Sequence, residues 1–218
     1  IMPTCLLTIV LSINLGGTFI EFGARDGIEG SNSYYFEKTL NWSGLLVEGL
    51  NREFKRLITN RPYPLIIKQK GLLCSKAGKR EYLWATGDVR YQGWGGFKEE
   101  LQRSGALEAL IKAQKANPSL QVKSRMMECL SLNSLLDNAG MKNITLLSAD
   151  CEGCELEVLK SLNWNAYVPT VILVEKAGDE KRLCEVIDLV MSKGYTAVNW
   201  NSSDVVFVRS ELVSNLSL

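Results

Sequence analysis

Residues 18–48, TFIEFGARDGIEGSNSYYFEKTLNWSGLLVE, contain the pattern that decides the fold. An apolar stretch of strand length, Thr18–Phe22, ends at a turn that contains glycines. Ser31–Leu40 follows, with the composition of a helix that begins at a capping serine. Gly44–Glu48 is a short apolar run of the kind that forms buried parallel strands. Strand, turn, helix and strand in this order predict the start of a sheet built from βα units.

The alternation of strand-length and helical segments continues from this turn to the end of the chain. Further helices are predicted at Asn51–Asn60, Ser131–Asn138, Cys154–Leu162 and Asp179–Lys193, and further strands at Leu65–Lys70, Leu120–Cys129, Ile144–Asp150 and Thr170–Glu175. Tyr195–Trp200 and Asp204–Arg209 are predicted to form a closing antiparallel hairpin. Repeated βα units predict a mostly parallel sheet with helices on both faces.

Residues 76–128 interrupt this alternation as an insertion. Its first part, 76–97, is rich in glycine and aromatic residues and has little periodicity, so we predict a short hairpin followed by a mobile loop. A helix is predicted at Lys98–Ala116, before an Asn-Pro pair. Such an insertion is a natural place for a substrate lid. Three aromatic residues of the insertion could stack on a sugar ring or pack the loop down: Trp84, Tyr91 and Trp94.

The composition excludes several classes of protein. The chain has 218 residues, 25 of them basic and 24 acidic, and its formal net charge of +1 gives no general attraction to nucleic acid or to an anionic membrane. That length suits one ordinary domain. The chain has no histidine. Ser-His-Asp triads, Cys-His dyads and the common zinc enzymes are therefore excluded, because all of them need an imidazole.

Six cysteines are scattered through the chain, and in a domain of this length we expect reduced, buried thiols. Cys151-Glu-Gly-Cys154 places two of them in a C-x-x-C pattern between a predicted strand and a predicted helix. Thioredoxin-like proteins place their redox pair in this setting, which makes a thiol-disulfide enzyme a competing hypothesis. The other interpretation is two ordinary thiols beside a turn. A zinc site would need two further ligands, so we predict no metal site.

Residues 1–17 form an apolar N-terminal segment without charged residues. Its run of eleven residues, Cys5–Leu15, is too short to span a membrane as a helix and could be a packed element or the remnant of an anchor or signal. Because the first residue is Ile1, we expect a truncation at this end. The predicted domain covers 18–210, with a tail at 211–218. A cytoplasmic location is favoured, and association with a secretory-pathway membrane through the missing N-terminal part is the alternative.

The turn after the first predicted strand, Glu21-Phe-Gly23-Ala-Arg25-Asp-Gly27, is the strongest candidate for a binding site. Glycine lets the backbone bend tightly and lets a ligand approach main-chain atoms. Glu48 ends the next predicted strand about twenty residues later, the spacing at which a carboxylate accepts hydrogen bonds from both hydroxyls of a ribose. Glu21 lies beneath the turn and could bind the ligand or the loop's own amides. The pattern favours a binding site for a nucleotide-like ligand over the alternative that these residues only form a turn.

These residues resemble a known family. The block GTFIEFGARDGIEGSNSYYFEKTLNWSGLLVEGLNREFKRLITNRP (17–62) is similar to the N-terminal half of FkbM-type S-adenosylmethionine-dependent methyltransferases. LLSADCEGCELEVLKSLNW (146–164) resembles the same family's strand with Asp-x-Glu-Gly and the helix after it, and TVILVEK (170–176) resembles its next strand. The resemblance covers most of residues 17–210 and is loose over 76–128. It implies a Rossmann-like class I methyltransferase fold, a mostly parallel seven-stranded sheet with an antiparallel last strand.

The resemblance also implies which residues hold the cofactor S-adenosylmethionine. They are Glu21, Gly23, Gly27 and Glu48, with Ser31 and Asn32 nearby, Cys74 and Ser75 bordering the adenine, and Asp150, Glu152 and Glu175 facing the reacting end of the cofactor and the substrate. One position departs from the family's pattern, because the middle of the turn, often Asn in this family, is Arg25. A guanidinium beside a cationic sulfonium is repulsive unless it points at the methionine carboxylate. Arg25 therefore either clamps that carboxylate or weakens cofactor binding.

Methyl transfer to a hydroxyl is helped by a base, and the histidine-free chain offers carboxylates. Asp150 and Glu152 follow one predicted strand and Glu175 ends a neighbouring one, so all three are expected at the ligand-binding end of the sheet. Acids that converge there can raise one another's pKa towards that of a general base. The alternatives are a divalent cation bound by these oxygens, stabilisation of a helix dipole by Asp150 and Glu152, and a surface ion pair between Glu175 and Lys176.

The sequence says less about the molecule that accepts the methyl group. Between Asn51 and Arg80 nine basic residues accompany one acid, Glu53, which favours either a solvated helix face or a surface for an anionic substrate such as a phosphorylated sugar or lipid. No nucleic-acid recognition motif is visible, and no nucleic-acid partner is expected. We predict methylation of an oxygen on a small molecule or glycan. A cofactor-free interaction domain on the same fold is the main alternative, because Arg25 could spoil the turn.

Overall fold

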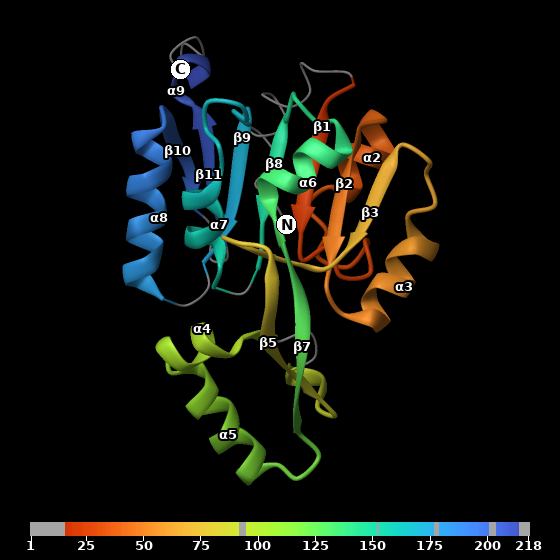
Figure 1. Cartoon of the computed structure of the whole chain (residues 1–218), viewed down its shortest axis with the longest axis vertical. Helices are drawn as coiled ribbons and strands as arrows, with labels where there is room; N and C mark the ends of the chain where they lie inside the picture. The colour runs from red at the N-terminus through yellow and green to blue at the C-terminus, as the bar shows by residue number, and fades with distance from the viewer. Residues whose placement is uncertain (1–15, 92–94, 152, 177–178, 201–203, 214–218) are drawn as a thin grey trace.

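A computed structural model of the chain describes residues 16–91, 95–151, 153–176, 179–200 and 204–213. Within these residues two sheets and the helices around them make up the fold (Figure 1). The larger sheet has seven strands in the order β10-β11-β9-β8-β1-β2-β3, and the smaller one has four in the order β4-β7-β5-β6.

The larger sheet has the predicted topology. Its strands are β1 (Thr18–Phe22), β2 (Ser43–Glu48), β3 (Ile66–Lys70), β8 (Leu146–Ala149), β9 (Val171–Glu175), β10 (Tyr195–Trp200) and β11 (Asp204–Arg209). The central strands β1, β8 and β9 are buried on both faces, which explains their nearly continuous apolar sequences. β1 pairs in parallel with β2 and β8, whereas β11 pairs antiparallel with both β9 and β10. The predicted mostly parallel sheet with an antiparallel last strand is confirmed.

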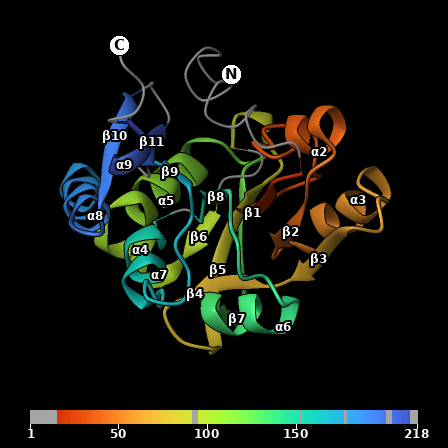
Figure 2. The same ribbon diagram turned by 90° about the horizontal axis from the view of Figure 1, so that it is seen from above.

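Helices cover both faces of this sheet because successive strand residues point to opposite sides. Phe19 packs on one face in a cluster with residues of α2 (Tyr34–Leu40) and α3 (Asn51–Asn60). Ile20 packs on the other face in a cluster to which three further helices contribute: α6 (Leu132–Ala139), α7 (Glu155–Ser161) and α8 (Glu180–Ser192). Figure 2 shows α2 and α6 on opposite sides of β1 and β2. A short helix, α9 (Ser210–Val213), follows β11.

Three of the four strands of the smaller sheet belong to an arm, residues 78–131, that extends beyond the carboxyl ends of the parallel strands (Figure 1). In the arm, β5 (Gly78–Thr86) pairs antiparallel with β7 (Gln121–Ser131) and with β6 (Gly95–Phe97). The segment between β5 and β7 also contains η1 (Val89–Tyr91), α4 (Lys98–Arg103) and α5 (Ala106–Ala116). At the base of the arm, β4 (Leu72–Cys74) pairs in parallel with β7.

The arm corrects two sequence-based predictions. The short antiparallel pair predicted within 76–97 is present only as Tyr82–Trp84 of β5 with β6, whereas β5 pairs along its whole length with the distant β7, and the mobility of a loop here stays a prediction. Local sequence does not reveal this pairing, since two helices separate the partner strands. The single helix predicted at Lys98–Ala116 is two helices, because Gly105 between them adopts φ +76°, a left-handed angle that favours glycine.

Two disulfides correct the expectation of reduced thiols. Cys74 of β4 bonds to Cys129 of β7, and Cys151 bonds to Cys154. The first pair is 55 residues apart in the sequence and is brought together by the pairing of β4 with β7, which the sequence does not reveal. The two other cysteines are Cys184, which is free and exposed, and Cys5, which lies outside the described residues.

Several sequence-based predictions fall outside the described part of the chain. The apolar run Cys5–Leu15, the aromatic Trp94 and the acid Glu152 belong to this group. None of the helices that the structure describes is long and apolar enough to cross a membrane. The domain limits at 18 and 210 stay predictions.

Candidate functional site

The carboxyl ends of β1, β2 and β8 meet around a cavity of about 70 Å³ that we call the glycine-turn cavity. The turn after β1 contributes Gly23, the end of β2 contributes Glu48, and Asp150 follows β8. Its walls also include Leu50 and Leu72. Open α/β sheets bind their ligands at this end of the parallel strands.

Two predicted glycines of the turn are required by their surroundings. Gly23 adopts φ +67°, and a Cβ on it would lie 2.4 Å from the carbonyl oxygen of Asp150. Gly27 adopts φ +80°, and a Cβ on it would lie 2.5 Å from Cδ1 of Leu57. Left-handed backbone angles favour glycine, and these contacts leave no room for a side chain. The turn therefore presents bare main chain to the cavity at Gly23.

Arg25, the residue that departs from the family's pattern, lies in the same turn with φ +47°. Its backbone N–H donates a hydrogen bond to Oε2 of Glu48 at 2.9 Å. Its guanidinium is directed along the loop, with Nη1 3.7 Å from the Cβ position of Gly30. Arg25 thus lines the glycine-turn cavity without closing it.

Glu48 supports the turn from the end of β2. Besides the Arg25 N–H, it accepts a hydrogen bond from the backbone N–H of Leu50, at 2.6 Å from Oε1. Burial raises the pKa of Glu48 to about 7, because the loss of hydration outweighs the backbone N–H groups that favour the charged form. The cavity wall therefore contains a carboxyl group that titrates near neutral pH.

Glu21 binds the loop and does not line the glycine-turn cavity. It accepts hydrogen bonds from the backbone N–H of Asn32 at 2.6 Å, from Ser31 Oγ at 2.8 Å and from Ser33 Oγ at 2.5 Å. Burial is the largest cause acting on the carboxyl, and it raises the pKa of Glu21. Ser31 and Asn32 are thus partners of Glu21 and lie outside the cavity lining. The helix predicted from Ser31 begins only at Tyr34, since the residues before it form this loop.

A fully buried arginine, Arg61, completes this network and is missing from the sequence-based candidates. Its Nη1 donates to the carbonyl oxygen of Gly27 at 2.8 Å, and its Nη2 donates to Ser33 Oγ at 3.2 Å. Its Nε donates to the buried carboxylate of Glu37. An arginine that follows an amphipathic helix is ordinarily solvated, so the sequence carries no signal for this role.

Asp150 and Glu175 form a hydrogen-bonded pair at the ends of neighbouring strands. Burial is the main cause that raises the pKa of Glu175, the charge of Asp204 adds to it, and the hydrogen bond with Asp150 acts against it. The pair brings together two of the three predicted acids, and Glu152 lies outside the described residues. Among those residues no group of three or more histidine, cysteine, aspartate or glutamate side chains is arranged to hold a metal ion.

Glu155, the first residue of α7, is a further buried acid that the sequence does not single out. Its Oε1 accepts hydrogen bonds from the backbone N–H groups of Cys151 at 2.9 Å and Gly153 at 3.1 Å. Burial is the largest cause acting on its carboxyl and raises the pKa of Glu155. These bonds hold the turn that follows Asp150. Acids are common in the first turn of a helix, so the pattern alone does not mark this residue.

Cys74 and Ser75 do not line the glycine-turn cavity, although the family resemblance implies that they border the adenine. Cys74 is buried in its disulfide, and Ser75 is exposed. The chain leaves β3 at Gly71, and Leu72 and Leu73 form the wall instead.

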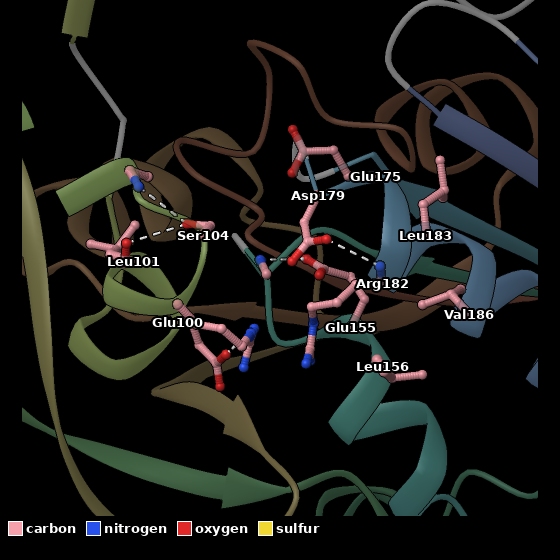
Figure 3. A pocket seen from close by; sticks show the side chains of 13 residues that line it. Glu100, Leu101, Ser104, Glu155, Leu156, Glu175, Asp179, Arg182, Leu183 and Val186 are labelled. Atoms are coloured by element: carbon pink, nitrogen blue, oxygen red, sulfur yellow. Dashed lines mark hydrogen bonds and ion pairs between the residues drawn. The ribbon is translucent and has the colours of Figure 1, made fainter. Parts of the chain in front are cut away.

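Two further cavities adjoin this site. One, of about 70 Å³, lies between the arm and α8 and is lined by Glu100, Glu175 and Arg182 among other residues (Figure 3). We call it the arm–α8 cavity. Because Glu175 lines it while Asp150 lines the glycine-turn cavity, the carboxyl pair stands between the two.

The other adjoining cavity is larger, about 680 Å³, and lies between the start of α3 and the arm. Trp84 is part of its wall, as are Arg25 and Lys70. Tyr91 packs against an apolar cluster inside the arm. Of the aromatic residues predicted to contact a ligand or pack the insertion, Trp84 thus faces a cavity and Tyr91 packs.

A model of the methyltransferase FkbM domain family matches residues 21–209 of the chain. The chain belongs to this FkbM family. The matched range contains every residue of the glycine-turn cavity and the whole arm. The FkbM domain accordingly has a Rossmann-like methyltransferase fold, as the comparison with solved structures also shows.

Methyltransferase FkbM from Methylobacillus flagellatus KT has a crystal structure similar to this FkbM domain, with a TM-score of 0.52, 12% sequence identity, and coverage of 89% of this chain and 44% of that one. The chain therefore spans less than half the length of that protein. The fibrillarin pre-rRNA processing protein of Methanococcus jannaschii matches with a TM-score of 0.49, 9% identity, and coverage of 91% and 68%. No curated protein matches the chain.

Proposed function

We propose that this FkbM domain binds S-adenosylmethionine across the glycine-turn cavity and the larger cavity of about 680 Å³ that adjoins it, and catalyses methyl transfer to an oxygen of a small molecule or glycan. One observation carries the proposal: the carbonyl of Asp150 fills the Cβ position of Gly23, so bare main chain faces the cavity beside Glu48. Close main-chain approach and a carboxylate at a strand end are what an adenosyl group requires. When bound, the cofactor supplies a methyl group on an electrophilic sulfonium.

Glu48 is the residue proposed to hold the ribose. Its two oxygens have about four lone-pair positions, and the backbone N–H groups of Arg25, Leu50 and Gly49 use three of them. A ribose hydroxyl can therefore bind without breaking the bonds that hold the turn. Leu50 and Leu72 offer apolar walls for the adenine ring.

Arg25 is proposed to bind the methionine carboxylate of the cofactor. Its guanidinium runs along the loop towards Gly30, which leaves the cavity open and places the cation beside the turn. Guanidinium and carboxylate form charge-assisted hydrogen bonds, whereas a guanidinium aimed at the sulfonium would repel it. This arrangement supports the clamp over the alternative in which Arg25 weakens binding.

The Asp150–Glu175 pair is the proposed general base. Its members lie at the carboxyl ends of β8 and β9, and burial raises the pKa of Glu175. A carboxylate whose pKa is raised is a stronger base, so the unprotonated pair can take the proton from an acceptor hydroxyl. The arm, which lies over these strand ends, would exclude water from the reacting atoms.

Calorimetric titration with S-adenosylmethionine and with its demethylated product tests this function. We expect micromolar binding by the wild-type chain, no measurable binding by Glu48→Ala, and retained binding without turnover for Asp150→Ala. Glu29→Ala is the matched control for Glu48→Ala, because Glu29 is an exposed acid of the same loop that does not line the glycine-turn cavity.

The outcome of this titration separates the enzyme from a cofactor-free interaction domain. Heat with the wild-type chain that disappears in Glu48→Ala and persists in Glu29→Ala supports the enzyme. Absence of heat with both ligands would leave the interaction domain as the better description.

The Cys151–Cys154 disulfide favours a second candidate, a thiol-disulfide enzyme. Cys151 lines the glycine-turn cavity, but Cys154 is almost fully buried. An insulin-reduction assay with dithiothreitol tests this candidate: turnover by the wild-type chain that is lost in Cys151→Ser would establish it.

The two disulfides also support an oxidising compartment, the secretory alternative, over the cytoplasm. Alkylation of the protein isolated from its native cells, followed by mass spectrometry, tests this. Free thiols at Cys74 and Cys129 would favour the cytoplasm.

A further inference from the structure

The arm–α8 cavity is built jointly by the arm and the core of the domain. Ser104 and Glu100, at α4, form its arm side, while Glu155, Glu175 and Arg182 belong to the core side (Figure 3). A volume of about 70 Å³ holds roughly five water molecules, and this is the space that a small polar group needs.

Apart from Oε2 of Glu100, which is ion-paired with Arg103, two buried polar atoms of residues that line this cavity lack a hydrogen-bond partner among the described residues. Oε2 of Glu175 is one, although the carboxyl group as a whole bonds to Asp150. Nη2 of Arg182 is the other, and its ion pair with Glu157, at 3.6 Å, is longer than a hydrogen bond. One atom is an acceptor and the other a donor. Buried polar atoms without partners are costly, so groups of this kind are satisfied by water or by a ligand.

We propose that the arm–α8 cavity recognises a neutral group with neighbouring hydroxyls, such as one edge of a sugar or cyclitol ring, on the methyl acceptor. One hydroxyl donates to Oε2 of Glu175, and a second accepts from Nη2 of Arg182. The inference rests on the proposed function, since the hydroxyl at Glu175 is then next to the carboxyl pair and the glycine-turn cavity. Arg182 would be a specificity-determining residue.

The charges around the cavity favour a neutral ligand. Glu100, Glu155, Glu175 and Asp179 line it together with two arginines, Arg103 and Arg182. Arg103 pairs with Glu100, which leaves Arg182 among three carboxyl groups. A phosphate or carboxylate on the ligand would face these acids at short range, whereas hydroxyls can serve both the acceptor and the donor.

The probe for the test is myo-inositol, a neutral ring with adjacent hydroxyls, titrated into the full chain and followed by saturation-transfer difference NMR. Inorganic phosphate is the anionic comparison. Arg182→Met removes the donor and keeps the length of the side chain. Lys181→Met is its matched control, an exposed cation on the same helix that does not line the cavity. Ser104→Phe, at an exposed position of the arm side, places a bulky side chain at the cavity and leaves every residue of the core side unchanged.

We expect myo-inositol to bind the wild-type chain and Lys181→Met equally, and to bind Arg182→Met and Ser104→Phe at least about tenfold more weakly. Phosphate should not displace it. Equal binding to wild type, Arg182→Met and Ser104→Phe would overturn the inference, as would absence of binding to wild type or tighter binding of phosphate.

A parallel calorimetric titration with S-adenosylmethionine separates this inference from the proposed function. Arg182 does not line the glycine-turn cavity, so Arg182→Met should bind the cofactor as wild type does. A wild-type chain that binds myo-inositol in the expected pattern but no cofactor would refute the proposed function alone.

Discussion

At the scale of single residues, Glu48 couples folding to pH. Its pKa rises from 4.5 to about 7 because burial disfavours the charged form, so the folded state binds its proton more tightly than the unfolded chain does. The resulting stability is fully present below about pH 4.5 and is lost as the pH rises through about 7. The change corresponds to roughly 3 kcal/mol in the free energy of unfolding.

Urea unfolding at pH 5 and pH 8 measures this contribution. We expect the free energy of unfolding to fall between the two pH values by less in Glu48→Gln than in the wild-type chain, because the amide does not ionise. An identical fall in both proteins would show that other groups cause it.

The same carboxyl group should affect cofactor binding in the opposite direction. Ribose hydroxyls donate to the ionised carboxylate, so affinity for S-adenosylmethionine should rise with pH through about 7. If only the ionised form binds, the gain between pH 6 and pH 8 is about tenfold. Calorimetric titrations of the wild-type chain across this range measure it, and a flat profile would show that Glu48 does not bind the ribose in its charged form.

Gly23 tests the close contact at the turn. Gly23→Ala would place its Cβ 2.4 Å from the Asp150 carbonyl at φ +67°, so we expect roughly 1–3 kcal/mol of destabilisation and loss of cofactor binding. Gly140→Ala is the control, because Gly140 has φ +63° but no atom within 4 Å of its Cβ position. Thermal unfolding and calorimetry should show a larger effect for Gly23→Ala, and equal effects would leave only the backbone angle as the cause.

At the scale of elements, the buried Arg61–Glu37 pair joins the end of α3 to α2 and to the glycine turn. Arg61→Met removes the buried partner of Glu37 and leaves it beside the half-exposed Lys38, so we expect a loss of about 3–5 kcal/mol in the free energy of unfolding. The double variant Arg61→Met/Glu37→Leu removes both charges and should regain most of it.

Cofactor affinity distinguishes the two roles of Arg61. The double variant still lacks the donor to the Gly27 carbonyl, so its affinity for S-adenosylmethionine should stay low when its stability returns. Denaturant unfolding combined with calorimetry measures both quantities. Recovery of affinity together with stability would mean that the turn does not need Arg61.

The elements that the sequence predicts well are those decided by local pattern. β1, β2 and β9 are short apolar runs between turn residues, and α3 has its exact predicted limits, Asn51–Asn60. The arm is different, because β5 forms by pairing with the distant β7 and carries little periodicity of its own. Long-range pairing is therefore where local reasoning fails.

The sequence likewise predicts some residues of the candidate site and misses others. The spacing in the sequence is enough to predict Gly23 and Glu48 as site residues, because Gly23 comes directly after one predicted strand and Glu48 ends the next. Spacing does not show which way a side chain points: Phe22 lines the cavity, whereas Glu21 beside it turns to the loop. Arg61 is beyond prediction, because its burial depends on three elements that meet only in the folded chain.

At the scale of the whole molecule, the Cys74–Cys129 disulfide ties the arm to the core. It closes a segment of 55 residues, for which loop-closure entropy predicts roughly 4 kcal/mol of stabilisation. We expect Cys74→Ala/Cys129→Ala to lose about that much free energy of unfolding and therefore to unfold at a lower denaturant concentration. Cys184→Ala, which removes an exposed free thiol, should not change stability. Equal midpoints for the double variant and wild type would contradict this role.

The position of Asp150 and Glu175 has a consequence for how ligands on the two sides influence each other. A proton that binds to this pair changes the charge next to both cavities. An occupant that stabilises the protonated pair on one side must alter the affinity of the other side, and by thermodynamic reciprocity the factor is the same in both directions. Binding of the methyl donor and binding of the methyl acceptor would then be coupled through one exchangeable hydrogen, without any movement of the chain.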